Sequence, residues 1–333
     1  AAIHSLEEGR TSYTSNRGMS DLRELISDYS RRWGHDYDPD TEVLVTTGAS
    51  EAVDLALRTF VSPGETVAIH QPNYISYRPG IEFAGGEPLG VTTSADNDFA
   101  LTPAALRAAG ADEADLLVLC YPNNPTGAVM DADEIRAVAE FCVDNDIDVI
   151  ADEIYAALTY EGDHTSIASM PGMRERTIVI NGFSKAYAMT GLRLGYALGP
   201  AEAIASMNRV HQYTMLSAPT TAQFAAIEAL RSCEDAVTEM ATEYNRRRRF
   251  VLSRFEEMGL DCFRSRGAFY AFPECGGDDQ AFAEDLLEAE GVAVVPGSVF
   301  GEGGEGHLRV SYATGMRELK TAMNRLETFY RNR

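Results

Sequence analysis

Short apolar runs recur along the chain, and most are followed by a turn and then by a helical pattern. Three runs, at residues 116–120, 147–151 and 177–180, have the length and composition of buried strands. Patterns at 51–60 and 131–143 have the spacing of helices that cover a sheet. Alternating strands and helices favour a parallel sheet, because each crossover helix returns the chain to the same edge. The sequence therefore predicts an α/β fold with a doubly wound, mostly parallel sheet.

The pattern changes after Gly259, where short strands and helices follow one another less regularly. The predicted elements in this part are residues 268–272, 282–289, 292–295, 308–312 and 317–330. A chain of 333 residues is long enough for one large and one smaller domain. We expect a large domain at 12–235 and a small α+β domain made of 1–11 and 236–333.

The chain is strongly acidic, with a formal net charge of −23. This charge argues against nucleic acid as a partner, because phosphates would be repelled. A basic run at 246–249 lies in a helical pattern that also carries glutamates, and we interpret it as a solvated helix face. The sequence lacks a run of about eighteen apolar residues that could span a membrane and has no recognisable signal peptide. We therefore expect a cytoplasmic protein.

Basic residues are almost all arginine, since only Lys185 and Lys320 among the 28 Lys and Arg residues are lysines. An acidic chain with so little lysine resembles proteins of salt-loving organisms, in which salt screens the repulsion between carboxylates. We therefore expect a halophilic protein whose stability rises in molar salt.

Five cysteines form no Cys-x-x-Cys pair, and six histidines show no metal-ligand spacing. We expect free thiols and no metal site.

Lys185 is the first candidate for chemistry. A guanidinium stays protonated, whereas a desolvated lysine amine can lose its proton and attack a carbonyl carbon. Lys185 lies just past the apolar run at 177–180, at a strand end of the kind where α/β proteins bind ligands. Lys320 lies in a charged helical pattern, so we expect it at the surface. The alternative for Lys185 is a lysine exposed by chance.

The turn formed by Gly48, Ala49 and Ser50 is a candidate phosphate site. It joins a short strand at 43–45 to the helix at 51–60. Backbone N–H groups and the positive end of a helix dipole meet at such a turn, and small residues leave the approach open. Many strand–helix turns share this pattern, so a plain connection is the alternative.

Further polar and aromatic residues follow other strands. Tyr74 comes after the strand at 66–70 and could stack on a planar ring or pack in the core. Asn124, in a loop made rigid by two prolines, could bind a ligand oxygen or close a structural turn. Asp152 and Tyr155 follow the strand at 147–151 and are well placed to contact a heterocycle.

A glycine-rich segment at 301–306 matches Gly-x-Gly-x-x-Gly. A dinucleotide-binding segment must follow a strand and open a helix, whereas this one precedes a strand and carries two glutamates. We interpret it as a flexible loop.

These candidates together fit one ligand. A phosphate suits the turn at 48–50, a pyridine ring suits a stacking aromatic and a carboxylate at its nitrogen, and an aldehyde suits a lysine. That ligand is pyridoxal 5′-phosphate.

Four motifs resemble those of the class I/II aminotransferases, the fold-type I pyridoxal-phosphate enzymes. They are PNNPTGAV at 122–129, DEIY at 152–155, SKAYAMTGLRLGY at 184–196 and HLRVSYAT at 307–314. The sequence resembles most the archaeal and bacterial aspartate and aromatic aminotransferases, from about Tyr13 onward. The resemblance implies a large domain with a mostly parallel seven-stranded sheet and a smaller α+β domain. In this family an N-terminal arm carries a glycine near the substrate. That arm is absent here, and we expect that it was either lost or lies outside this sequence.

The resemblance also implies roles around the ring of the cofactor. Lys185 would bind the cofactor as an imine and then move the proton between the substrate Cα and C4′. Asp152 would pair with the ring nitrogen and keep it protonated. Asn124 and Tyr155 would contact the phenolic oxygen, with Asn124 also near the substrate, and Tyr74 would stack on the ring.

At the phosphate end, the resemblance assigns Arg193 and the amides of Ala49 and Ser50. Tyr13 would reach the phosphate of a neighbouring subunit, which implies a homodimer. Arg309 would hold the substrate α-carboxylate with two hydrogen bonds.

The sequence departs from this family in two places. Many relatives have a phosphate-binding serine where this chain has Gly182, and Ser184 is a further candidate for that role. Ser50 stands where some aspartate-specific relatives have a basic residue.

The activity implied is that of an amino-acid aminotransferase. It would move an amino group from aspartate or an aromatic amino acid to a 2-oxo acid such as 2-oxoglutarate, by a ping-pong mechanism. A β-eliminating C–S lyase, a decarboxylating relative and a non-catalytic pyridoxal-phosphate-binding regulator are the alternatives. Turnover that depends on 2-oxoglutarate would distinguish the aminotransferase from all three.

Overall fold

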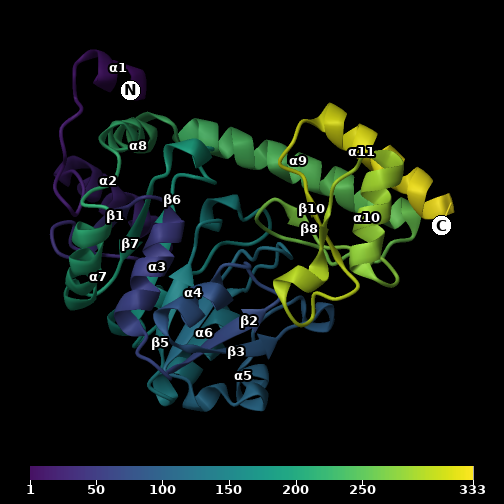
Figure 1. Cartoon of the computed structure of the whole chain (residues 1–333), viewed down its shortest axis with the longest axis horizontal. Helices are drawn as coiled ribbons and strands as arrows, with labels where there is room; N and C mark the ends of the chain where they lie inside the picture. The colour runs from purple at the N-terminus through teal and green to yellow at the C-terminus, as the bar shows by residue number, and fades with distance from the viewer. Residues whose placement is uncertain (333) are drawn as a thin grey trace.

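A seven-stranded sheet lies at the centre of the large part of the molecule (Figure 1). The computed structural model describes residues 1–332. The strand order is β1-β7-β6-β5-β4-β2-β3. β7 is antiparallel to its neighbours β1 and β6, and the other neighbouring pairs are parallel, which confirms the predicted mostly parallel sheet. The strands are β1 (Val43–Thr46), β2 (Thr66–Gln71), β3 (Glu87–Thr92), β4 (Leu116–Cys120), β5 (Asp148–Asp152), β6 (Thr177–Gly182) and β7 (Gly195–Leu198).

Helices cover both faces of this sheet, which explains why its central strands are apolar along their length. On β4, Leu116 and Val118 pack against one face with α3, α4 and α7. Leu117 and Leu119 point to the opposite face, where α5 and α6 lie. The helices of the large part are α2 (Ser20–Ser30), α3 (Ala49–Phe60), α4 (Tyr77–Ala84), α5 (Pro103–Ala109), α6 (Ala132–Asp144), α7 (Ala201–Thr214) and α8 (Thr220–Ser232).

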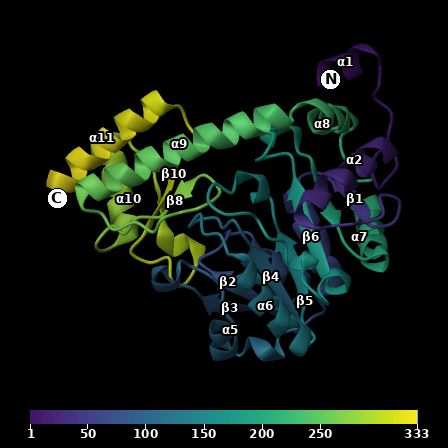
Figure 2. The same cartoon turned by 180° about the vertical axis from the view of Figure 1, so that it is seen from behind.

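A long helix, α9 (Glu234–Met258), leads from α8 to a smaller group of elements. Figures 1 and 2 show it as a rod along one side of the molecule. The group has a small antiparallel sheet in the order β8-β10-β9 and a core of its own. Its elements are β8 (Tyr270–Ala271), β9 (Val295–Pro296), β10 (Leu308–Ser311), α10 (Asp279–Glu290) and α11 (Met316–Asn332).

The structure differs from the sequence-based expectation in the connection between β5 and β6. The expected alternation of strands and helices would place a helix there, but the chain forms three short 3-10 turns at 156–158, 167–169 and 174–176. The strands predicted at 268–272 and 292–295 shrink to two residues each. Elements β3, β7, α4, α5 and α7 were not predicted. β7 is short and contains glycine, and β3 contains Pro88 and Gly90, so neither has a strong strand pattern.

The first helix, α1 (Ala2–Glu7), packs against α8. The assignment of 1–11 and 236–333 to one domain stays a prediction.

The expectation that the basic run at 246–249 is a solvated face was wrong for one residue. Arg248 is 1% exposed, forms an ion pair with Glu161 and donates to the carbonyl oxygen of Ser265 at 2.5 Å. The helical pattern alone does not show that a loop of the small part covers this side of α9.

Other expectations about single residues are confirmed. Cys120, Cys142, Cys233 and Cys262 are free thiols, Lys320 is exposed, and the glycine-rich segment at 301–306 forms a loop before β10. Within residues 1–332, every helix is too short or too polar to cross a membrane.

Candidate active site

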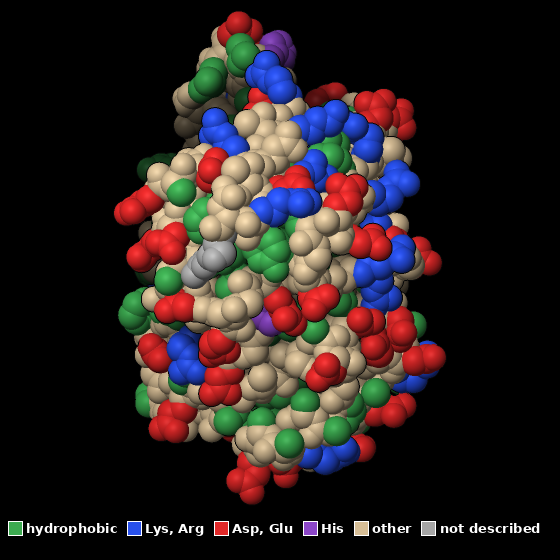
Figure 3. Space-filling model, turned by 90° about the vertical axis from the view of Figure 1, so that its right-hand side faces the viewer, with side chains coloured by type: hydrophobic (Ala, Val, Ile, Leu, Met, Phe, Trp, Pro, Cys, Tyr) green, Lys and Arg blue, Asp and Glu red, His purple; other side chains and the backbone are tan. Residues whose placement is uncertain are grey.

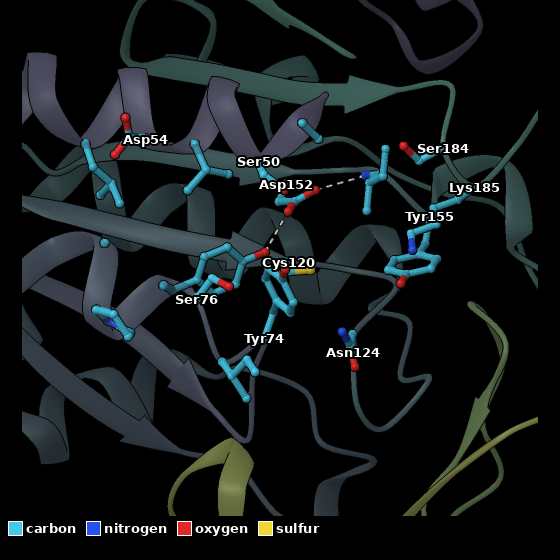
Figure 4. A pocket seen from close by; sticks show the side chains of 18 of the residues that line it. Ser50, Asp54, Tyr74, Ser76, Cys120, Asn124, Asp152, Tyr155, Ser184 and Lys185 are labelled. Atoms are coloured by element: carbon cyan, nitrogen blue, oxygen red, sulfur yellow. Dashed lines mark hydrogen bonds between the residues drawn. The ribbon is translucent and has the colours of Figure 1, made fainter. Parts of the chain in front are cut away.

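A cavity of about 730 Å3 opens where β4 and β5 end and α3 begins. Figure 4 shows side chains from several separate segments pointing into it. Ten of the predicted site residues line it, although they are scattered through the sequence: Ala49, Ser50, Tyr74, Asn124, Asp152, Tyr155, Ser184, Lys185, Arg193 and Arg309. The structure thus brings the predicted residues together at the carboxyl edge of the sheet.

The turn at residues 48–50, at the start of α3, and the guanidinium of Arg193 together form a cationic site, which we call the cup. Gly48 has a φ of 82°, and a Cβ atom there would lie 2.6 Å from Nη2 of Arg193. The Arg193 guanidinium therefore packs directly on the glycine, and its Nη1 donates to the carbonyl oxygen of Thr190 at 2.9 Å. Gly195 on β7 approaches the same backbone so closely that a Cβ would meet Ala49. A helix N-terminus, open backbone and a fixed arginine together suit a phosphate.

Behind the cup, Glu51 fixes the turn to the rest of the fold. Its carboxylate accepts a hydrogen bond from the backbone N–H of Thr47 and contacts Nδ1 of the buried His211 on α7 at 2.7 Å. The position of the cup is therefore set by two elements, α3 and α7.

Lys185 lies half-buried between the cup and the small part of the molecule. Its Nζ is 5.6 Å from the ring centroid of Tyr155 and 5.4 Å from that of Phe269. Burial is the main reason that the pKa of Lys185 lies below its ordinary value. The Asp152 carboxylate opposes this shift, whereas Arg309 and Arg193 add to it. The amine is therefore unprotonated at lower pH than an exposed lysine, as attack on an aldehyde requires.

Asp152 ends β5 and is 6% exposed. Its Oδ2 accepts a hydrogen bond from the hydroxyl of Tyr77 at 2.7 Å, and its Oδ1 accepts one from the backbone N–H of Ile154 at 3.1 Å (dashed lines in Figure 4). Burial raises the pKa of Asp152, and the two hydrogen bonds and Lys185 oppose that rise. A cationic ring nitrogen would be a favourable partner for such a buried carboxylate.

Arg309 forms the other cationic end of the cavity. Its guanidinium lies between the rings of Tyr270 and Phe300, at 4.7 and 4.8 Å from their centroids. Its Nη1 donates to Oδ1 of Asn124 at 2.8 Å, while its buried Nε has no hydrogen-bond partner within residues 1–332. An unpaired donor on a fixed guanidinium is ready to bind a carboxylate.

Two predicted residues lie outside the lining. Gly48 lies against the guanidinium of Arg193, as described above. Tyr13 does not line the cavity, and its side chain is 82% exposed. At Gly182 a Cβ would lie 2.8 Å from Cα of Gly195, so a serine does not fit this backbone.

Sequence reasoning missed two tyrosines of the site. Tyr77 holds Asp152, and the hydroxyl of Tyr270 lies 2.9 Å from that of Tyr155. Tyr270 falls in the predicted strand at 268–272, but nothing in that pattern indicates which side chain meets Tyr155. Tyr77 is the first residue of α4, which was not predicted, so no signal in the sequence indicated its contact with Asp152.

The residues present fit pyridoxal phosphate. The cup offers groups for a phosphate, and Lys185 has a lowered pKa. Among residues 1–332, none forms a salt bridge with the buried Asp152. Arg309, with a free donor, remains for a substrate carboxylate.

Comparison with known proteins supports the same identification. Residues 1–326 match the family described as aminotransferase class I and II. YugH of Bacillus subtilis is 49% identical over 333 residues, covering 99% of this chain and 86% of the relative. The aspartate aminotransferase of Pyrococcus abyssi is 40% identical over 339 residues, covering 100% of this chain and 87% of the relative.

A solved structure of similar shape is the aromatic aminotransferase from Pyrococcus horikoshii, with a TM-score of 0.97 and 41% sequence identity. The match covers 99% of this chain and 91% of that one. Fold, cavity chemistry and relatives agree, and the chain therefore belongs to the class I and II aminotransferases and is a pyridoxal-phosphate-dependent aminotransferase.

Proposed function

We propose that the protein takes the amino group from aspartate or an aromatic amino acid and gives it to a 2-oxo acid such as 2-oxoglutarate, by a ping-pong mechanism. One observation carries this proposal. Lys185 lies within the electrostatic influence of two arginines, Arg193 at the phosphate cup and Arg309 at the opposite end. Arg193 would bind the phosphate of the cofactor. Arg309 remains to bind the α-carboxylate that amino acids and 2-oxo acids share. Relatives named for aspartate and for aromatic amino acids support these two donor classes.

The residues around the ring bind the cofactor, orient it and transfer protons. When bound, the cofactor supplies an aldehyde for amino groups and a ring that accepts electrons. The Lys185 amine would hold the cofactor through its aldehyde, with release of water, and would move a proton at the substrate Cα. The Asp152 carboxylate holds a proton on the ring nitrogen by a charge-assisted hydrogen bond. Asn124 and Tyr155 orient the phenolic oxygen, and Tyr74 covers one face of the ring.

The two ends of the cavity hold the two anionic groups. The backbone amides of Ala49 and Ser50 and the guanidinium of Arg193 bind the phosphate, with Ser184 as a further donor. Arg309 binds the substrate α-carboxylate with two hydrogen bonds, beside Asn124. The ring contacts of Arg309 keep its guanidinium plane fixed, which lowers the entropy lost on binding.

The active assembly in this proposal is a homodimer. Tyr13 carries an 82% exposed side chain near the start of the chain, and in a dimer its hydroxyl would reach the phosphate of the neighbouring site. We also propose that the protein is cytoplasmic and halophilic, on the basis of its composition and its net charge of −23.

The test follows the cofactor absorbance of the purified protein in molar salt. Aspartate or phenylalanine should bleach the band of the bound cofactor, and 2-oxoglutarate should restore it. A band that bleaches with neither donor would contradict the donor classes. Bleaching that 2-oxoglutarate does not reverse would point to elimination or decarboxylation. Lys185→Ala is the control, and it should bind cofactor but fail to turn over repeatedly.

A further inference from the structure

Tyr77 is the first residue of α4 and is 1% exposed. Its hydroxyl donates to Oδ2 of Asp152 at 2.7 Å. Its ring meets the ring of Tyr74 edge to face, with centroids 5.6 Å apart and planes at 82°. Its backbone N–H donates to the carbonyl oxygen of Tyr74 at 3.2 Å. One buried residue therefore contacts both the carboxylate and the aromatic ring that are assigned to the cofactor ring.

The Asp152 carboxylate depends on such contacts, because a buried anion without hydrogen bonds is costly. One of its two bonds comes from the backbone N–H of Ile154, which the end of β5 fixes. The other comes from the Tyr77 side chain, and this bond opposes the rise in the pKa of Asp152 that burial causes. Burial also raises the pKa of Tyr77 well above its ordinary value, so the hydroxyl remains a donor.

We propose that Tyr77 is a positioning residue, which keeps the Asp152 carboxylate ionised and directed at the cofactor ring nitrogen and holds Tyr74 at the ring face. This inference rests on the roles proposed above for Asp152 and Tyr74. It adds a residue of the cavity lining that the sequence did not predict. Its effect on the reaction passes through Asp152 and Tyr74.

The experiment measures cofactor affinity by absorbance titration of the apoprotein at several pH values. Tyr77→Phe removes only the hydroxyl. The affinity should fall about tenfold, because a hydrogen bond to a charged group is lost. Without that bond the pKa of Asp152 is higher, so Asp152 becomes protonated at higher pH. The loss of affinity on acidification should therefore begin at a higher pH than in the unmodified protein.

Tyr121→Phe is the matched control. Tyr121 is also buried, and its hydroxyl donates to the carbonyl oxygen of Phe99 at 2.8 Å, away from the cavity. This variant loses a buried hydrogen bond, so its thermal stability should fall, but its cofactor affinity and pH profile should stay unchanged. The inference would be overturned if the two variants had the same cofactor affinity and the same pH profile.

A second pair of variants separates this inference from the proposed function. In an Asp152→Asn background, Tyr77→Phe should have little further effect on affinity, because the charge it stabilises is gone. An undiminished effect in that background would show that the Tyr77 hydroxyl does not act through the Asp152 charge, and the inference would fail. If Asp152→Asn alone changes neither affinity nor turnover, the role of Asp152 itself is wrong.

A measurement without a Tyr77 variant covers the case in which Tyr77→Phe does not fold. The infrared difference spectrum between the unmodified protein and Asp152→Asn should lack a protonated-carboxyl band at neutral pH. Such a band would show that the hydrogen bond from Tyr77 does not keep Asp152 ionised, and the inference would fail.

Discussion

Lys185 is the single lysine of the site, and two guanidinium groups and burial together lower the pKa of its amine. Burial, Arg309 and Arg193 all lower the pKa of Lys185, and only Asp152 among the named neighbours raises it. A lysine in this setting differs from Lys320, which is exposed on α11. Lys320 can therefore serve as a reference for an exposed lysine in the same chain.

The first prediction concerns the pH at which the apoprotein captures pyridoxal phosphate. The initial rate should rise as Lys185 loses its proton, with a midpoint below the ordinary lysine value. Arg309→Leu removes a neighbouring positive charge, so the protonated amine is less disfavoured and the midpoint should move to higher pH. Arg317→Leu, at an exposed arginine on α11, should leave the midpoint unchanged. An identical midpoint in the Arg309 variant would show that this arginine does not act on Lys185.

Arg309→Leu should also weaken the binding of every α-amino acid to a similar degree. The lost bidentate contact is to the α-carboxylate, which all of them carry, and KM should rise about a hundredfold. Steady-state kinetics with aspartate and phenylalanine measure this. A large effect on one donor and none on the other would instead place Arg309 at the substrate side chain.

Among single residues, the sequence predicted those that directly follow a strand, such as Lys185 and Asp152. Their position after the strand is enough to place them at the edge of the sheet where the cavity lies. The sequence did not predict Tyr77, because the hydrogen bond to Asp152 joins residues 75 positions apart and depends on how α4 packs. It was wrong about Arg248, because the sequence does not show which side of α9 the Ser265 loop covers.

At the scale of elements, the turn between β1 and α3 fixes the cup that we propose for the phosphate. Gly48 allows both the positive φ and the contact with Arg193. The carboxylate of Glu51 then ties the turn to His211 on α7. The cup is therefore preformed by the packing of α3, α7 and β7.

Gly48→Ala should weaken cofactor binding about tenfold, because the new methyl group displaces Arg193 from its phosphate-binding position. Gly64→Ala is a matched control, since Gly64 also has a positive φ of 87° but no atom within 4 Å of a Cβ. Both variants should lose about 1 kcal/mol of stability from backbone strain. Equal cofactor affinity in the two variants would show that the contact with Arg193 does not matter.

The sequence predicted elements with long, regular patterns. Strands β4, β5 and β6 and helix α6 are present within a residue or two of their predicted bounds. The elements it missed or lengthened, such as β8 and β9, are two-residue strands held by pairing with β10. Such pairing is a property of the folded molecule and leaves little local pattern.

At the scale of the whole molecule, the net charge of −23 is the dominant electrostatic feature. The face in Figure 3 carries acidic and basic side chains side by side, so local pairing offsets part of the repulsion. The excess of carboxylates remains, and salt screens it. The composition predicted this charge directly, whereas the placement of α1 against α8 required the structure.

The melting temperature should therefore rise as KCl is increased to molar concentrations. Sucrose at matched osmolality is the control, because it is excluded from protein surfaces but screens no charge. The rise in KCl should exceed that in sucrose. A melting temperature that is flat or falls with KCl would contradict the halophilic interpretation.

The most direct test of the central claim uses the fact that the chain has only two lysines. The holoprotein is treated with borohydride, which reduces an imine to a stable amine, and the labelled peptide is identified by mass spectrometry. The cofactor should be attached to Lys185, Lys185→Ala should abolish the label, and Lys320→Arg should leave it intact. A label on Lys320, or a holoprotein that turns over without any label on Lys185, would contradict the central claim.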